Sequence, residues 1–206
     1  MDRRDAIRRH YEPRISPHRE SHDILDWADR AAQRARFAVL ADHVALAGRS
    51  LLDVGCGLGD LWGYLKERGV EAEYTGVDLL DSMLDLARRH YPHATFVAGD
   101  PFTEDPFPGR RFDVVFGSGV FNLDLGNNME FLAWGVPRLW ALAGEHLVFN
   151  LLHRRAAHHY DHCFYYDPHE VLAVLSGMDL SAAVIDDYLP NDFTVLCARA
   201  LTGRVT

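Results

Sequence analysis

The sequence predicts an α/β fold, a three-layer sandwich around a seven-stranded, mostly parallel sheet that ends in a C-terminal antiparallel hairpin. Two observations predict this fold. Up to residue 152, short apolar segments alternate with helix-like segments, which is typical of parallel strands joined by crossover helices. Near the end of the chain, two apolar segments are separated only by Pro190-Asn191-Asp192. A connection that short joins antiparallel strands.

The elements follow from local patterns. Strands are expected at 50–54, 72–78, 94–100, 111–119, 145–152, 181–189 and 193–200. Helices are expected at 24–47, 58–68, 81–90, 127–143 and 167–177. Asp23 is the expected N-cap of the first helix, which Gly48 ends, and Gly69 ends the second. Pro137 is expected to kink or divide its helix, whereas Pro168 suits the first position of a helix.

Composition limits the class of protein. A length of 206 residues suits a single domain, with 1–47 as an N-terminal helical lid segment and 48–206 as a cofactor-binding core. The formal net charge of −9 argues against nucleic acid as the main partner, because phosphate binding needs excess Lys and Arg. The three cysteines are scattered, which favours a reducing compartment. Without a signal peptide or a long apolar run, we expect a cytoplasmic protein with no membrane partner.

The most informative segment is residues 51–60, LLDVGCGLGD. An apolar strand leads directly into Gly55, Gly57 and Gly59, which permit a sharp turn and close approach of a ligand to the main chain. The spacing G-x-G-x-G differs from the G-x-G-x-x-G of dinucleotide-binding turns. Asp60 follows it, and a carboxylate there repels a pyrophosphate. A cationic ligand such as S-adenosylmethionine, which carries a sulfonium and an ammonium group, suits this turn better.

Acidic residues stand at the ends of three successive strands. Asp53 ends the first, Asp78 the second and Asp100 the third. Asp78 lies about 20 residues after the glycines, which is the spacing expected of a carboxylate that accepts ribose hydroxyls. A single aspartate after a strand is commonly a turn former, but all three after this glycine turn indicate a nucleoside-containing ligand.

With these motifs the sequence resembles the class I S-adenosylmethionine-dependent methyltransferases, over about residues 50–152. LLDVGCGLG, GVD, VAGD and FDVVFGSG resemble the first four motifs of that family. The resemblance implies a Rossmann-like fold, S-adenosylmethionine as cofactor and its demethylated form as product. It also implies that the methionine portion contacts Asp53, Gly55, Gly57 and Gly59, the ribose Asp78, the adenine Leu79, Asp100 and Phe102, and the amino group Gly117 and Ser118.

The resemblance implies methyl transfer to a small-molecule acceptor, as O- or N-methylation by direct in-line displacement. Such a reaction needs mainly alignment of the acceptor atom. The segment after the fourth strand lacks the N/D-P-P-Y/F signature of amino-group methyltransferases. We expect Phe121, Asn122 and Asp124 to contact the acceptor; equally, the two polar residues can cap the helix that begins near Asn127.

The loop 153–166 contains several histidines and tyrosines. We predict His159, Tyr160 and His162 as catalytic residues and Tyr165 as an acceptor contact, because aromatic rings form apolar walls and a histidine can take a proton near neutral pH. The alternative is a solvated loop. On a helix, His158 and His162 would share one face with metal-ligand spacing, but the further ligands that a metal needs would point elsewhere. We therefore predict no metal.

The N-terminal segment supplies the remaining candidates. Tyr11 and Trp27 are expected to contact the acceptor if the segment folds over the cofactor as a lid. Arg36 is a candidate partner for the methionine carboxylate, with an ordinary surface arginine as the alternative. The competing functions are a methyltransferase acting on a protein or RNA, a non-catalytic binding module, and an NAD(P)-dependent oxidoreductase of the same fold class.

Overall fold

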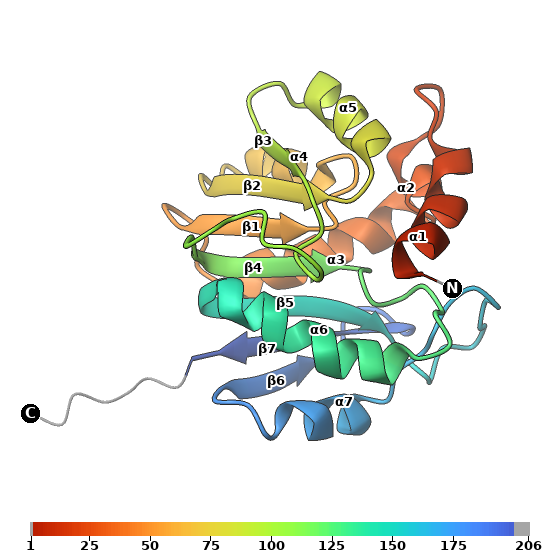
Figure 1. The fold of residues 1–206 in the computed structure, drawn as a ribbon, viewed down its shortest axis with the longest axis vertical. Coiled ribbons are helices and arrows are strands. Elements are labelled where there is room, and N and C mark those ends of the chain that lie inside the picture. The colour runs from red at the N-terminus through yellow and green to blue at the C-terminus, as the bar shows by residue number, and fades with distance from the viewer. Residues whose placement is uncertain (1, 200–206) are drawn as a thin grey trace, which may run out of the picture.

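The computed structural model describes residues 2–199, and its centre is a seven-stranded sheet of order β3-β2-β1-β4-β5-β7-β6 (Figure 1). The strands are β1 (Ser50–Val54), β2 (Glu73–Asp78), β3 (Thr95–Ala98), β4 (Phe112–Ser118), β5 (Ala143–Leu152), β6 (Ser181–Ile185) and β7 (Asp192–Ala198). Each overlaps a strand expected from the sequence; position 200 of the last expected strand lies outside the described residues.

Strand direction agrees with the prediction. The first five strands pair in parallel, for example through Leu51↔Tyr74 and Leu51↔Val114. β7 pairs antiparallel with both β5 and β6. The predicted fold class, including the C-terminal antiparallel hairpin, is confirmed.

Helices cover both faces of the sheet (Figure 1). They are α1 (Arg3–Tyr11), the 3₁₀ helix η1 (Glu12–Arg14), α2 (Ser21–Ile24), α3 (Arg30–His43), α4 (Asp60–Glu67), α5 (Asp81–His90), α6 (Asn128–Leu142) and α7 (Pro168–Leu175). Alternating side chains of each strand reach opposite layers. Leu51 packs with α3 and α4, whereas its neighbour Leu52 packs in the cluster that α6 and α7 complete.

The helix predicted at 24–47 was wrong in two respects. The expected helix 24–47 is divided into α2 and α3, and Asp26 in the break has a φ of 59°. Asp29, not Asp23, caps α3 by accepting a hydrogen bond from the Ala32 amide. Pro137 lies inside α6, which continues through it as one helix. It therefore does not divide the helix, which was one of the two effects expected of it, and the neighbouring Val136 is fully buried.

The N-terminal elements lie at the functional edge of the sheet. Figure 1 shows α1 and α2 beyond the tips of β1 and β2, where the parallel strands end. A small cluster joins this segment to the core: Ile24 of α2 is buried with Leu58 of the glycine turn and Leu80 after β2. Within residues 2–199, no helix has the length and apolarity needed to cross a membrane.

Candidate functional site

A cavity of about 440 Å³ lies at the carboxyl ends of β1, β2 and β4. Three parts of the chain line it: the turns after these strands, the N-terminal segment, and the loop 153–166. Ligand sites typically measure about 300–1,000 Å³. The predicted lid and acceptor segments therefore meet the strand-end acids around one space.

The glycine turn after β1 forms the floor of the cavity. Gly55 and Gly57 line it, with φ of 66° and 53°, in the left-handed region that favours glycine. A Cβ at Gly57 would lie 2.6 Å from the side chain of Leu25, so the lid segment packs directly on the turn. Gly59 does not line the cavity; a Cβ there would meet Phe96.

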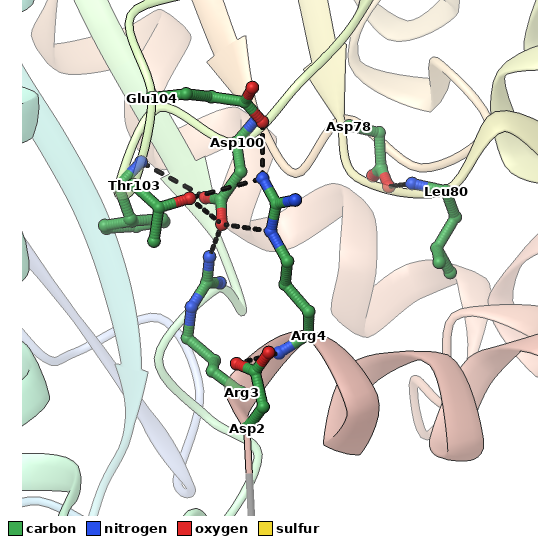
Figure 2. Close-up of polar contacts among 9 residues, drawn as sticks. Asp2, Arg3, Arg4, Asp78, Leu80, Asp100, Thr103 and Glu104 are labelled. Atoms are coloured by element: carbon green, nitrogen blue, oxygen red, sulfur yellow. Dashed lines mark hydrogen bonds and ion pairs between the residues drawn. The ribbon is translucent and has the colours of Figure 1, made fainter.

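Asp78 at the end of β2 braces the glycine turn. Its carboxylate accepts hydrogen bonds from the Gly57 amide and the Leu80 amide, both at 2.9 Å (Figure 2 shows the second). Burial raises the pKa of Asp78 and these amides oppose the rise. Each carboxylate oxygen retains a lone pair for a ligand hydroxyl. Leu79 beside it also lines the cavity, so both residues are accessible to a ligand there.

Asp53 of β1 is a second buried carboxyl group on the cavity wall. It accepts a 2.7 Å hydrogen bond from the Tyr74 hydroxyl. Burial raises the pKa of Asp53 to about 7, despite the hydrogen bond, and the charge of Asp78 adds to the rise. A cation in the cavity would favour the ionised form.

Asp100 after β3 is held by the N-terminal helix. Arg3 forms an ion pair with it, and Arg4 reaches both Asp100 and Glu104 (Figure 2). The Arg3 guanidinium also lies 4.9 Å from the centre of the Phe102 ring. Arg3 thus occupies the position between an acid and an aromatic ring that the resemblance assigns to adenine.

Asp60 and Arg36, which the sequence predicts to interact with a ligand, bind other side chains of the protein in the structure. Asp60 lines the cavity, and its carboxylate accepts hydrogen bonds from Ser21 and Gln33. Arg36 also lines the cavity, but its guanidinium is buried in an ion pair with Asp192. It is therefore not a surface arginine, and its charge is already compensated.

The predicted contacts after β4 separate into two groups. Ser118, predicted to contact the cofactor, and Asn122, predicted to contact the acceptor, line the cavity. Phe121 does not, because it is buried in an aromatic cluster with Phe102. Asp124 is also outside the lining, and its carboxylate accepts a hydrogen bond from the Gly126 amide in the turn before α6. This is a contact within the turn, and the alternative that Asn122 and Asp124 cap the helix is wrong, because the N-cap of α6 is Asn127 and no side chain of the described residues forms a capping hydrogen bond there.

The loop 153–166 is not helical, so His158 and His162 do not form the helical pair that the metal alternative required. Tyr160, His162 and Tyr165 line the cavity. His159 does not line it; its ring stacks on that of Tyr165 with centroids 3.8 Å apart. Of the three predicted catalytic residues, two therefore reach the cavity.

The predicted acceptor contacts of the lid, Tyr11 and Trp27, also line the cavity. Trp27 packs against the turn at Gly119, where a Cβ would lie 2.8 Å from the indole ring. The Arg36 guanidinium lies 4.3 Å from the centre of the Trp27 ring on another side. Both predicted lid residues are thus part of the enclosure.

One cluster in the cavity wall was missed. His10, Asp26 and His162 meet there, with Nε2 of each histidine within 3.0 Å of the same Asp26 oxygen. The only sequence signal was the presence of these residue types, because three separate segments supply them. The fold alone brings them together.

Comparison with known proteins assigns the family. Residues 51–133, from β1 into α6, match the family model of a methyltransferase domain. This segment of the chain is a methyltransferase domain. S-adenosylmethionine is the cofactor of this family, so the predictions of family, fold and cofactor are confirmed.

Among curated relatives, the domain is 34% identical over 126 residues to a trans-aconitate 2-methyltransferase of Delftia acidovorans, covering 57% of this chain and 45% of that protein. It is 32% identical over 172 residues to a demethylmenaquinone methyltransferase of Chlorobaculum tepidum, covering 80% of this chain and 64% of the relative. The chain therefore spans less than two thirds of either relative.

Solved structures share the fold. A magnesium protoporphyrin IX methyltransferase from Synechocystis with bound SAH superposes with a TM-score of 0.67 at 17% identity, covering 95% of this chain and 94% of that one. DesVI from Streptomyces venezuelae superposes with a TM-score of 0.65 at 19% identity, covering 90% of this chain and 99% of that one.

One end of the cavity fits the cofactor of the family in its present conformation, and the other end does not. The glycine turn leaves the main chain accessible, and Asp53 and Asp78 give the wall negative charge suited to a cationic ligand. At the other end, Arg3 fills the space between Asp100 and Phe102. The fit therefore requires Arg3 to leave that space when an adenine enters it.

Proposed function

We propose that the protein transfers a methyl group from S-adenosylmethionine to a small-molecule acceptor. One observation carries the proposal: the cavity joins the glycine turn and strand-end acids to an aromatic wall from the loop 153–166 and the lid. A macromolecular acceptor would need an open approach, whereas Trp27 and Leu25 pack directly onto the turns at Gly119 and Gly57. No observation on the described residues favours a nicotinamide reaction.

When bound, the cofactor supplies an activated methyl carbon. The chain supplies position and environment. Gly55 and Gly57 offer main-chain approach, and Asp78 offers its free lone pairs to the ribose. Asp53 provides negative charge near the positive end of the ligand. Tyr160 and Tyr165 bound the remaining space, where they hold an acceptor and limit access of water.

The relatives suggest the first acceptors to test. The names of two of them specify trans-aconitate, a carboxylic acid, and demethylmenaquinone, a quinone-type ring. Both would present an oxygen or a ring carbon to the methyl group. We propose an acceptor of this size, because the cavity must hold both molecules in about 440 Å³ plus the space that movement of the lid opens.

The test is transfer of labelled methyl groups. Purified protein is incubated with methyl-labelled S-adenosylmethionine and a panel of small carboxylic acids, phenols and quinols, with tRNA and unfolded protein as macromolecular comparators. Acceptor-dependent label in a small product, with stoichiometric release of S-adenosylhomocysteine, supports the proposal. Label only in tRNA or protein would contradict it.

Asp78→Ala is the matched variant for this assay, because it removes the proposed ribose acceptor. Asp85→Ala is its control, since Asp85 lies on the exposed side of α5. Transfer should fall in the first variant and persist in the second. Equal activity of both would remove Asp78 from the proposed site.

A further inference from the structure

We propose that His10, Asp26 and His162 form a binding site for a divalent transition-metal ion in the wall of the cavity. Imidazole and carboxylate are ligands that Zn²⁺, Fe²⁺, Mn²⁺ and Co²⁺ share, and two histidines with one carboxylate leave coordination positions open. One ligand atom from each residue lies within 4.8 Å of the others.

The spacing suits coordination. Nε2 of His10 lies 3.0 Å and Nε2 of His162 2.9 Å from the same Asp26 oxygen. Two ligand atoms bound at about 2.1 Å and at right angles lie roughly 3.0 Å apart. The rings of the two histidines are already close, with centroids 5.0 Å apart. The three groups therefore need only small side-chain rotations to share one ion.

Hydrogen bonds account for only one of the two contacts between the histidines and Asp26. The His10 contact has hydrogen-bond geometry, whereas the His162 contact is recorded only by its ion-pair distance. Within residues 2–199, no other side chain forms a hydrogen bond to the Asp26 carboxylate. An ion between the three groups would use the lone pairs that converge there.

The backbone holds Asp26 in an unusual conformation. Its φ of 59° makes it the one non-glycine residue with a positive φ among the described residues. Such a conformation costs about 1 kcal/mol or more and persists where the surroundings require it. It falls in the break between α2 and α3 and places the carboxylate between imidazoles from α1 and from the loop 153–166.

The charge environment of the site includes one nearby cation. The Arg14 guanidinium, 3.6 Å from the Asp26 oxygen, opposes entry of a cation. It is anchored to the main-chain oxygen of His10 and is itself part-exposed. Replacing Arg14 should therefore strengthen metal binding.

The site lies in the same cavity as the proposed reaction. His10, Asp26 and His162 line it, so a ligand in the cavity can complete the coordination of the ion. Resting on the proposed function, the acceptor class that this site favours is one with an oxygen donor, such as a carboxylate or a phenolate. The metal would position that oxygen and keep it deprotonated.

The experiment measures metal binding without cofactor or acceptor. Metal-free protein is titrated with Zn²⁺ by calorimetry and with Co²⁺ by visible absorption, which reports nitrogen and oxygen ligation directly. We expect one equivalent of each ion to bind. His10→Gln and Asp26→Asn, which keep size and polarity, should each weaken binding by at least tenfold. Arg14→Gln should tighten it.

His18→Ala is the matched control, because His18 is an exposed histidine of the same N-terminal segment. It should bind Zn²⁺ as the unmodified protein does. Circular dichroism and thermal unfolding verify that each variant is folded. Absence of stoichiometric binding of Zn²⁺ and Co²⁺, or binding that survives unchanged in both His10→Gln and Asp26→Asn, would overturn the proposal.

The outcome is separable from that of the proposed function. S-adenosylhomocysteine binding is measured on the same metal-free protein. Binding of this ligand without binding of metal would refute only the metal site. Binding of metal without binding of this ligand would support the metal site and refute the methyltransferase function.

Discussion

Replacement of Arg3 by alanine should increase affinity for the cofactor. Arg3 occupies the space between Asp100 and Phe102 that an adenine ring would need. A ligand that binds there must first break this ion pair and move the guanidinium from the ring. In Arg3→Ala that step is absent, so more of the binding free energy remains.

The magnitude follows from the burial of the pair. The Arg3 side chain is 15% exposed and that of Asp100 2%, so solvent screening is limited. A hydrogen bond to a charged group contributes about 1.5–3 kcal/mol, and an exposed cation–π contact about 0.5–1 kcal/mol. Arg4 and Thr103 continue to bind Asp100 in the variant, so a ligand still competes with these two contacts and the gain in binding free energy is smaller than the sum. We expect a net gain of about 1–2 kcal/mol, roughly a 5- to 30-fold lower Kd.

Isothermal titration calorimetry with S-adenosylhomocysteine gives the Kd of each protein. Arg9→Ala is the control, since Arg9 is an exposed arginine of the same helix and its loss removes the same charge from the molecule. An unchanged or higher Kd in Arg3→Ala, with Arg9→Ala equal to the unmodified protein, would refute the competition and indicate that Arg3 stays in place or supports the bound ligand.

Three further predictions concern stability. The pKa of Asp53 is about 7 in the folded protein, against about 3.8 when unfolded, so between these pH values only the folded protein holds the proton. The free energy of unfolding should therefore fall by up to about 4 kcal/mol as pH rises from 4 to 8. Urea unfolding of Asp53→Asn should show a weaker dependence of this free energy on pH, and the same dependence in both proteins would contradict the prediction. Arg36→Ala leaves Asp192 buried without its partner and should cost about 3–5 kcal/mol, whereas a loss below 1 kcal/mol in thermal or urea unfolding would show the pair to be unimportant. Gly57→Ala should lose more stability and ligand affinity than Gly69→Ala, because both have positive φ but only the first would place a Cβ against a neighbour; equal effects would mean that backbone strain alone matters.

Local patterns were sufficient for the sheet and its glycine turn. An apolar strand followed by closely spaced glycines specifies its own geometry, so β1, Gly55 and Gly57 lie where the sequence predicts them. The lid was harder. Residues 24–47 contain an Ala-rich run without a glycine or proline at the break, and the turn at Asp26 uses a left-handed conformation that aspartate rarely signals.

Long-range pairs explain the remaining differences. Arg3 and Asp100 are separated by 97 positions and Arg36 and Asp192 by 156. No spacing rule connects such residues, because only the assembled fold brings them together. The sequence could therefore identify Asp100 as a strand-end acid and not that an arginine of the lid would bind it.

The central claim is that the cavity at the ends of β1, β2 and β4 receives a positively charged sulfonium nucleoside. Its most direct test is a pair of calorimetric titrations of the same folded protein, one with S-adenosylmethionine and one with NAD⁺. We expect saturable heat at one equivalent of S-adenosylmethionine and none with NAD⁺. Saturation by NAD⁺ alone, or by neither ligand, would contradict it.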